Sequence, residues 1–210
     1  RMLVEPECLL SQHALSQIWI MAANGTEEMD LIHYAKVGGM SAEDLPVEDK
    51  VLFNQWFAEL DNWYQEHYDN PGLDRILDIH ADTLFEQSWD YYNERHNSDV
   101  TISKQDSKLI IALTFACLTK IDQSRAVRNR MTLQEITDII NHPKLTPEVI
   151  GKVINIYREQ GNTFIRPFIQ DTEDQKLTPD TVLDITHESL IRNWLRLSQW
   201  VEKEFEYYET

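Results

Sequence analysis

Apolar residues in the first half of the chain recur at helical spacing. In residues 8–22 they fall three and four positions apart, the pattern of an amphipathic helix. The pair Asn24-Gly25 is typical of the end of such a helix. The same repeat predicts further helical stretches at about 29–37, 51–64 and 73–94. We therefore expect residues 1–100 to be entirely helical.

The second half of the chain has a different rhythm. Helix start signals predict three helices at about 105–120, 132–140 and 147–160. Two strands at 163–169 and 182–186 then enclose a polar loop, and a last helix begins near His187. This order is that of a winged helix. The predicted fold is mainly α: a helical-bundle subdomain over 1–100, a winged-helix subdomain with a two-stranded wing over 101–210, and a C-terminal helix.

Charge limits the partners of this chain. The net charge is −17, and residues 1–100 carry 20 acidic and five basic residues. Such a surface repels phosphate, so we expect no binding to nucleic acid or to an anionic membrane. No apolar run approaches the ~18 residues of a membrane span. Cys8 and Cys117 suggest buried free thiols in a reducing compartment, so we expect a cytoplasmic protein without a metal site.

Three segments of the second half bear on phosphate binding. The third helix of the expected winged helix has Lys152 and Arg158 balanced by two acids, and the loop 171–176 has three acids and one lysine. Both are unlike a DNA-reading surface. Arg125, Arg128 and Arg130 lie in a predicted loop before the second helix. They are either solvated or positioned to hold a phosphate.

Residues 182–200, "VLDITHESLIRNWLRLSQW", resemble the end of the winged-helix domain in signal-transduction NTPases of the STAND class, which includes NLR and AP-ATPase proteins. The match is closest to the bacterial "novel STAND" group, with His-Glu-small-Leu followed by Trp-x-x-Leu-x-x-Trp. Further stretches of the chain resemble other parts of that family: 8–19, 33–40, 73–87 and 125–136. Relative to the short family form, residues of about 41–72 are an insertion.

The resemblance implies a regulatory module of a larger parent protein. There, an upstream P-loop domain would bind ADP or ATP with Mg, this chain would close over the nucleotide in the off state, and downstream repeats would sense a ligand. The parent could form a homo-oligomer. The chain has no G-x-x-x-x-G-K-[ST] motif, so we expect no enzyme activity, catalytic residue or cofactor of its own. The alternative is a winged-helix module for protein–protein interaction or DNA binding.

His187 is the candidate site residue. From the residues alone, it either packs in a strand–helix corner or meets an anion at a helix N-terminus. Thr186-His187-Glu188 resembles the family motif Met-His-Asp, with Thr in place of Met. The resemblance implies that His187 contacts the β-phosphate of ADP in the parent, while Glu188 is a favourable first-turn acid.

Overall fold

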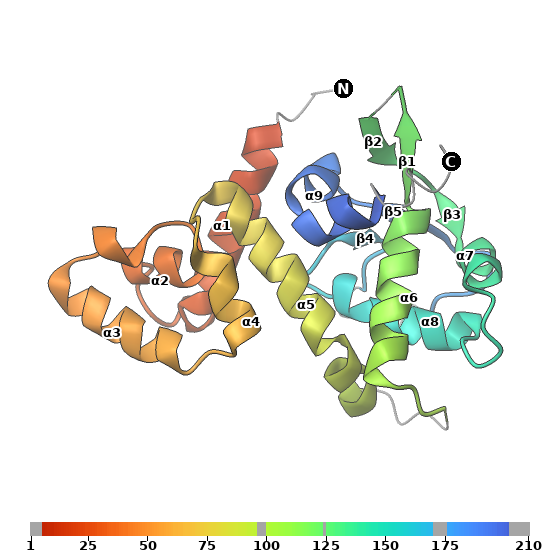
Figure 1. Cartoon of the computed structure of the whole chain (residues 1–210), viewed down its shortest axis with the longest axis horizontal. Coiled ribbons are helices and arrows are strands. Elements are labelled where there is room, and N and C mark those ends of the chain that lie inside the picture. The colour runs from red at the N-terminus through yellow and green to blue at the C-terminus, as the bar shows by residue number, and fades with distance from the viewer. Residues whose placement is uncertain (1–5, 96–99, 124, 170–175, 202–210) are drawn as a thin grey trace. The chain divides into compact units, whose positions relative to one another are not determined.

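The computed structural model describes residues 6–95, 100–123, 125–169 and 176–201 (Figure 1). It is mainly helical with small antiparallel sheets, which confirms the expected class. The chain divides into two compact units, residues 1–83 and 84–210, and each is described by itself. The change of pattern near residue 100 coincides with residues 96–99, which lie outside the described residues.

The first unit consists of helices, and its described residues contain no strand. The helices are α1 (Pro6–Met21), α2 (Leu31–Lys36), α3 (Val47–Ala58), α4 (Asn62–Gln65) and the beginning of α5 (Leu73–Arg95). The predicted stretch 51–64 is not one helix, because the chain turns between α3 and α4. There the Gln65 side-chain amide donates to the carbonyls of Phe57 (3.1 Å) and Leu60 (2.8 Å), so it replaces helical hydrogen bonds at the end of α3.

Two apolar clusters hold this unit together. In the first, Phe53 of α3 packs with Ile32 and Ala35 of α2, and aromatic rings surround it: Trp56, Phe57 and Tyr68. In the second, Ala14 of α1, Val37 and Ile76 of α5 are buried together. Large aromatic side chains contribute much of the apolar area that stabilises a small helical unit.

The second unit begins with the end of α5 and continues through alternating helices and short strands. These are α6 (Lys104–Cys117), β1 (Thr119–Asp122), β2 (Arg125–Arg128), β3 (Met131–Thr132), α7 (Leu133–Ile140), α8 (Pro147–Ile154), β4 (Ile165–Arg166), β5 (Val182–Ile185) and α9 (Glu188–Asn193). Ser103, Thr132 and Thr146 cap α6, α7 and α8 with their side-chain oxygens, as the sequence predicts.

Three sequence predictions are wrong in detail. The helix expected to reach residue 120 ends at Cys117, because the following residues form an antiparallel hairpin of β1 and β2. Arg125 and Arg128 therefore lie in the strand β2 and not in a loop. The expected strand over 163–169 is reduced to β4, which stops where Pro167 lacks the N–H to extend a ladder. The last helix is interrupted at Trp194, whose ψ of 101° is extended, and helical residues resume at 195–201.

The strands β3, β5 and β4 form an antiparallel sheet in that spatial order. Its central strand, β5, buries Leu183 and Ile185 in the core. Trp194 is fully buried in the same unit, with Phe115 of α6 in an edge-on ring contact at 4.9 Å between centroids. The chain leaves β5 beside this packed core and enters α9, and His187 lies between the two elements.

Candidate functional site

His187 occupies the N-cap position of α9. Its backbone is extended (φ −138°, ψ 136°), and its side chain does not cap the helix. The residue is half-buried. In the part of the chain that the structure describes, its imidazole makes no hydrogen bond and no ion pair. Its ring nitrogens are therefore not committed to any described protein group.

The surroundings of His187 favour its neutral form. Burial lowers the pKa of the imidazole below its ordinary value, and repulsion from Arg166 and Arg128 lowers it further. A neutral imidazole carries one N–H donor and one acceptor nitrogen. An anion bound beside the two guanidinium groups would offset their repulsion and raise the pKa again. Arg128 and Arg166 therefore contribute positive charge beside His187, which the Asp184 carboxylate near Arg128 partly offsets.

Arg128 is anchored to the end of β5. Its Nη1 donates to the carbonyls of Ile185 (3.1 Å) and Thr186 (3.3 Å) and lies 3.6 Å from Oδ2 of Asp184. Arg130 donates from Nε to the same carboxylate oxygen at 3.0 Å. Of the three arginines that lie close together in the sequence, Arg128 and Arg130 both contact the carboxylate of Asp184.

Arg125 does not join them. It stands at the exposed start of β2, opposite Asp122 in the strand register. By contrast, Arg166 of β4 comes near His187, a neighbour that sequence reasoning missed. The alternation of side chains along a strand could have revealed it. Ile165 faces the core, so Arg166 next to it points to the other side and is exposed.

Two buried oxygens beside the site have no hydrogen-bond partner within the described residues. They are Oδ1 of Asp184 and Oγ1 of Thr186. Buried polar atoms are almost always satisfied in native proteins, so such a pair marks a place where water or another group completes the bonding. Both atoms belong to the three residues before His187.

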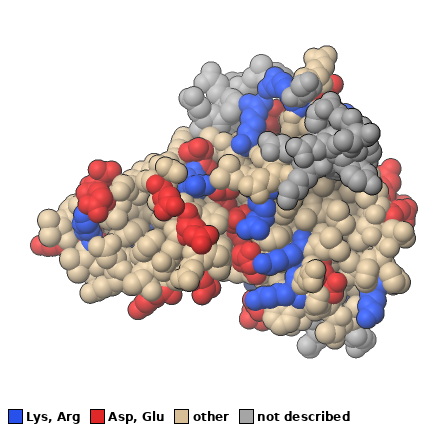
Figure 2. Space-filling view, viewed as in Figure 1, with Lys and Arg blue, Asp and Glu red and all other residues tan. Residues whose placement is uncertain are grey.

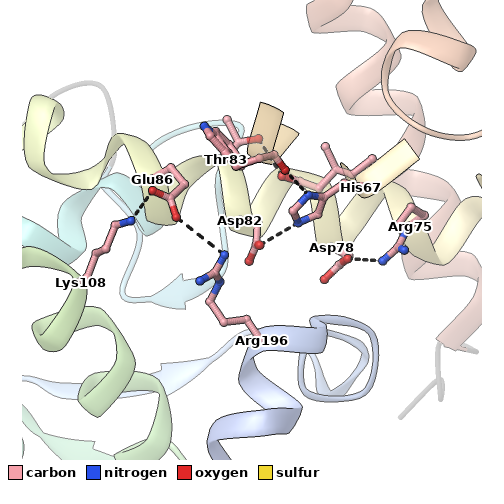
Figure 3. A network of polar contacts seen from close by, with 10 residues as sticks. His67, Arg75, Asp78, Asp82, Thr83, Glu86, Lys108 and Arg196 are labelled. Atoms are coloured by element: carbon pink, nitrogen blue, oxygen red, sulfur yellow. Dashed lines mark hydrogen bonds and ion pairs between the residues drawn. The ribbon is translucent and has the colours of Figure 1, made fainter. Parts of the chain in front are cut away.

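Other polar residues have structural partners instead. Glu188 pairs with Arg192 one turn later at 3.3 Å, a half-exposed pair that contributes little stability. In the first unit, His67 binds Asp82 (2.8 Å) and Arg75 binds Asp78 (2.6 Å); in the second, Glu86 pairs with Lys108 and Arg196 (Figure 3). These carboxylates are therefore ion-pair partners in the fold.

Histidines of the first unit are likewise engaged with the protein. His80 and His13 stack with ring centroids 5.1 Å apart, and Nδ1 of His80 lies 3.2 Å from Nε2 of His13. Among the described residues, no group of three or more His, Cys, Asp or Glu side chains is placed to hold a metal ion.

The third helix of the second unit offers little positive charge. Arg158, just beyond α8, is fully buried and donates from Nε to the carbonyl of Pro167 at 2.7 Å. Lys152 pairs with Glu148 at 2.8 Å. Of the acidic loop 171–176, residues 171–175 lie outside the described residues.

No protein family, no curated protein and no solved structure matches this chain. Over the residues that the structure describes, no helix combines the length and hydrophobicity required to cross a bilayer.

Proposed function

We propose that this chain is the regulatory helical and winged-helix part of a STAND-class signal-transduction NTPase. The observation that carries the proposal is the His187 imidazole, which has no hydrogen-bond partner among the described residues and lies within electrostatic range of Arg128 and Arg166. In this proposal, the His187 imidazole contacts the β-phosphate of ADP in the parent protein.

The arrangement of the second unit supports a winged helix. After α6 comes the separate hairpin of β1 and β2, and then β3, α7, α8, β4 and β5 follow; the sheet of the last three strands has the order β3-β5-β4. A three-helix core with one short strand before the second helix and a hairpin after the third is the winged-helix topology. The proposed domains are a helical lid over about 1–100, with an insertion at about 41–72, and a winged helix over 101–210.

The proposed partners are parts of the same parent protein. A P-loop domain upstream would hold ADP or ATP with Mg, and sensor repeats downstream would respond to a ligand. In this arrangement the chain itself performs no chemistry. It contributes donors to the nucleotide phosphates in the closed state and withdraws them in the open state, in a cytoplasmic switch.

His187 would act by differential binding to the two states. A hydrogen bond to a charged group is worth about 1.5–3 kcal/mol. If it forms only in the closed, ADP-bound state, losing it shifts the ratio of closed to open protein by about ten- to a hundredfold. The positive charges of Arg128 and Arg166 would also attract the phosphate in the closed state.

The test compares His187→Ala in the parent protein with His142→Ala, an exposed histidine of the same unit. We expect His187→Ala to raise the release rate of a fluorescent ADP analogue about ten- to a hundredfold, and His142→Ala to leave it unchanged. The melting temperature of the 210-residue chain should change little, because the ring has no described hydrogen bond to lose. Wild-type ADP retention, or marked destabilisation of the chain, would show that His187 is a packing residue.

A further inference from the structure

Helix α3 is apolar on two faces. Its inner face buries Phe53 against α2. Its outer face exposes three aliphatic side chains: Val47 at 82%, Val51 at 53% and Leu52 at 55%. Val47 and Val51 are one helical turn apart on the same face, and Leu52 lies about 100° further round the helix, on the adjoining face; the three are here called the α3 patch. Polar residues such as Glu48 and Asn54 are also exposed on α3, but three exposed aliphatic side chains on one helix are more than the scattered single ones of an ordinary surface and point to a binding partner.

Acidic residues border the α3 patch. Residues 41–72 contain eight acidic residues and one basic residue, Lys50, which is paired with Glu43. Glu48 and Asp49 lie on α3 itself, between the patch residues. Figure 2 shows acidic side chains in red spread over the region where Figure 1 places α2 and α3. A ligand of the α3 patch must therefore combine apolar and positively charged groups.

We propose that the α3 patch docks a basic amphipathic helix of a partner protein. Such a helix carries an apolar stripe to cover the three aliphatic side chains and Lys or Arg side chains to meet the acidic border. The border disfavours a second copy of this chain, because a symmetric contact would bring the same negative surfaces together. It disfavours nucleic acid and anionic membranes for the same reason. This inference is independent of the proposed nucleotide switch.

The α3 patch is held on a preformed support. On the inner side of α3, Phe53, Trp56 and Phe57 pack with Tyr68, whose hydroxyl donates to the carbonyl of Lys36 in α2. The patch residues themselves contribute little to this core. A binding surface that is already ordered loses less entropy on association, so even a small patch contributes usefully to affinity.

The experiment uses the 210-residue chain and two labelled lysine–leucine peptides of identical composition. One has the order of an amphipathic helix and the other is scrambled, so both have the same charge. By fluorescence anisotropy at physiological salt, we expect the amphipathic peptide to bind about tenfold or more tightly than the scrambled one. Hydrogen exchange should show protection within 47–58 when it is bound.

A triple variant, Val47→Ser/Val51→Ser/Leu52→Ser, isolates the α3 patch. It should lose about tenfold in affinity for the amphipathic peptide and none for the scrambled peptide. Ile139→Ser removes a similarly exposed aliphatic side chain from α7 and should change neither. If the triple variant fails to fold by circular dichroism, Glu48→Gln/Asp49→Asn keeps the patch and should weaken the amphipathic peptide several-fold.

Four outcomes would overturn the proposal. The first is equal binding of both peptides, and the second is protection outside α3. The third is self-association of the chain that the triple variant abolishes, which would assign the α3 patch to a second copy. The fourth is patch-dependent binding to phosphatidylcholine vesicles, which would assign it to a membrane surface.

Discussion

The ion pair between His67 and Asp82 makes a sharp prediction about stability and pH. His67 lies in the short helix η3 (Glu66–Tyr68), and Asp82 lies on α5. Nε2 of His67 is 2.8 Å from Oδ2 of Asp82, and Nδ1 is 2.8 Å from the carbonyl of Trp63. Both partners are acceptors, so the ring satisfies both only as an imidazolium that donates from each nitrogen.

Replacing His67 with Gln removes this charge and one of the two hydrogen bonds. The side chains are 18% and 5% exposed, so solvent screens the pair only weakly. A hydrogen bond involving a charged group contributes about 1.5–3 kcal/mol, and we expect His67→Gln to lower the free energy of unfolding of the first unit by that amount at acidic to neutral pH. His142→Gln, at an exposed position, is the control.

The pH dependence has a definite sign. The hydrogen bond to Asp82 raises the pKa of His67 above its ordinary value of 6.5, although burial opposes the shift. The folded state therefore holds the proton more tightly than the unfolded state. This stabilisation is fully present below the unfolded pKa and is lost as the pH rises through the raised folded pKa. The difference between wild type and His67→Gln should shrink accordingly.

Hydrogen exchange by mass spectrometry provides the assay, because it reports on the first unit separately from the second. Exchange of the α4 and α5 amides would be measured for wild type, His67→Gln and His142→Gln at about pH 6 and about pH 9, with correction for intrinsic exchange rates. An equal destabilisation by His67→Gln at both pH values would refute the imidazolium and leave His67 as a packing residue.

Three further predictions concern the second unit. Trp194→Ala should cost about 3–5 kcal/mol in denaturant unfolding, because the ring is fully buried against Phe115; a loss below about 1 kcal/mol would contradict that packing. Arg158→Met should cost about 3 kcal/mol, since its guanidinium donates to Pro167 and Asn155; an unchanged denaturation midpoint would mean that these bonds do not form. Duplex DNA should not bind at physiological salt, because Arg158 is buried and Lys152 is paired; a salt-dependent gel shift would disprove this.

Local signals in the sequence were enough to predict most helix boundaries. Ser103 and Thr132 each form a capping box with an acid three residues later, and Thr146 precedes Pro147 at the start of α8. Such caps involve groups within one turn, so their energies depend little on the rest of the chain. In the first unit, apolar periodicity located α1, α2 and α5, although it merged α3 and α4 into one stretch.

Departures from prediction come from distant partners. The hairpin of β1 and β2 forms because two short segments pair with each other, whereas single-segment periodicity extended the preceding helix to residue 120. The interruption at Trp194 lets its ring reach a fully buried position beside Phe115. In both cases packing overrides the local preference of the segment.

The candidate site also depends partly on local sequence and partly on distant partners. The sequence alone placed His187 where a strand pattern gives way to a helix pattern, and its proposed phosphate contact comes from the family resemblance. Only the tertiary structure selected its neighbours, since Arg128 is more than fifty positions away along the chain and Arg166 stands on another strand. The ends and caps of the helices depend on interactions within a few residues. The electrostatics of a site depend on which distant charged residues the packed core brings close together.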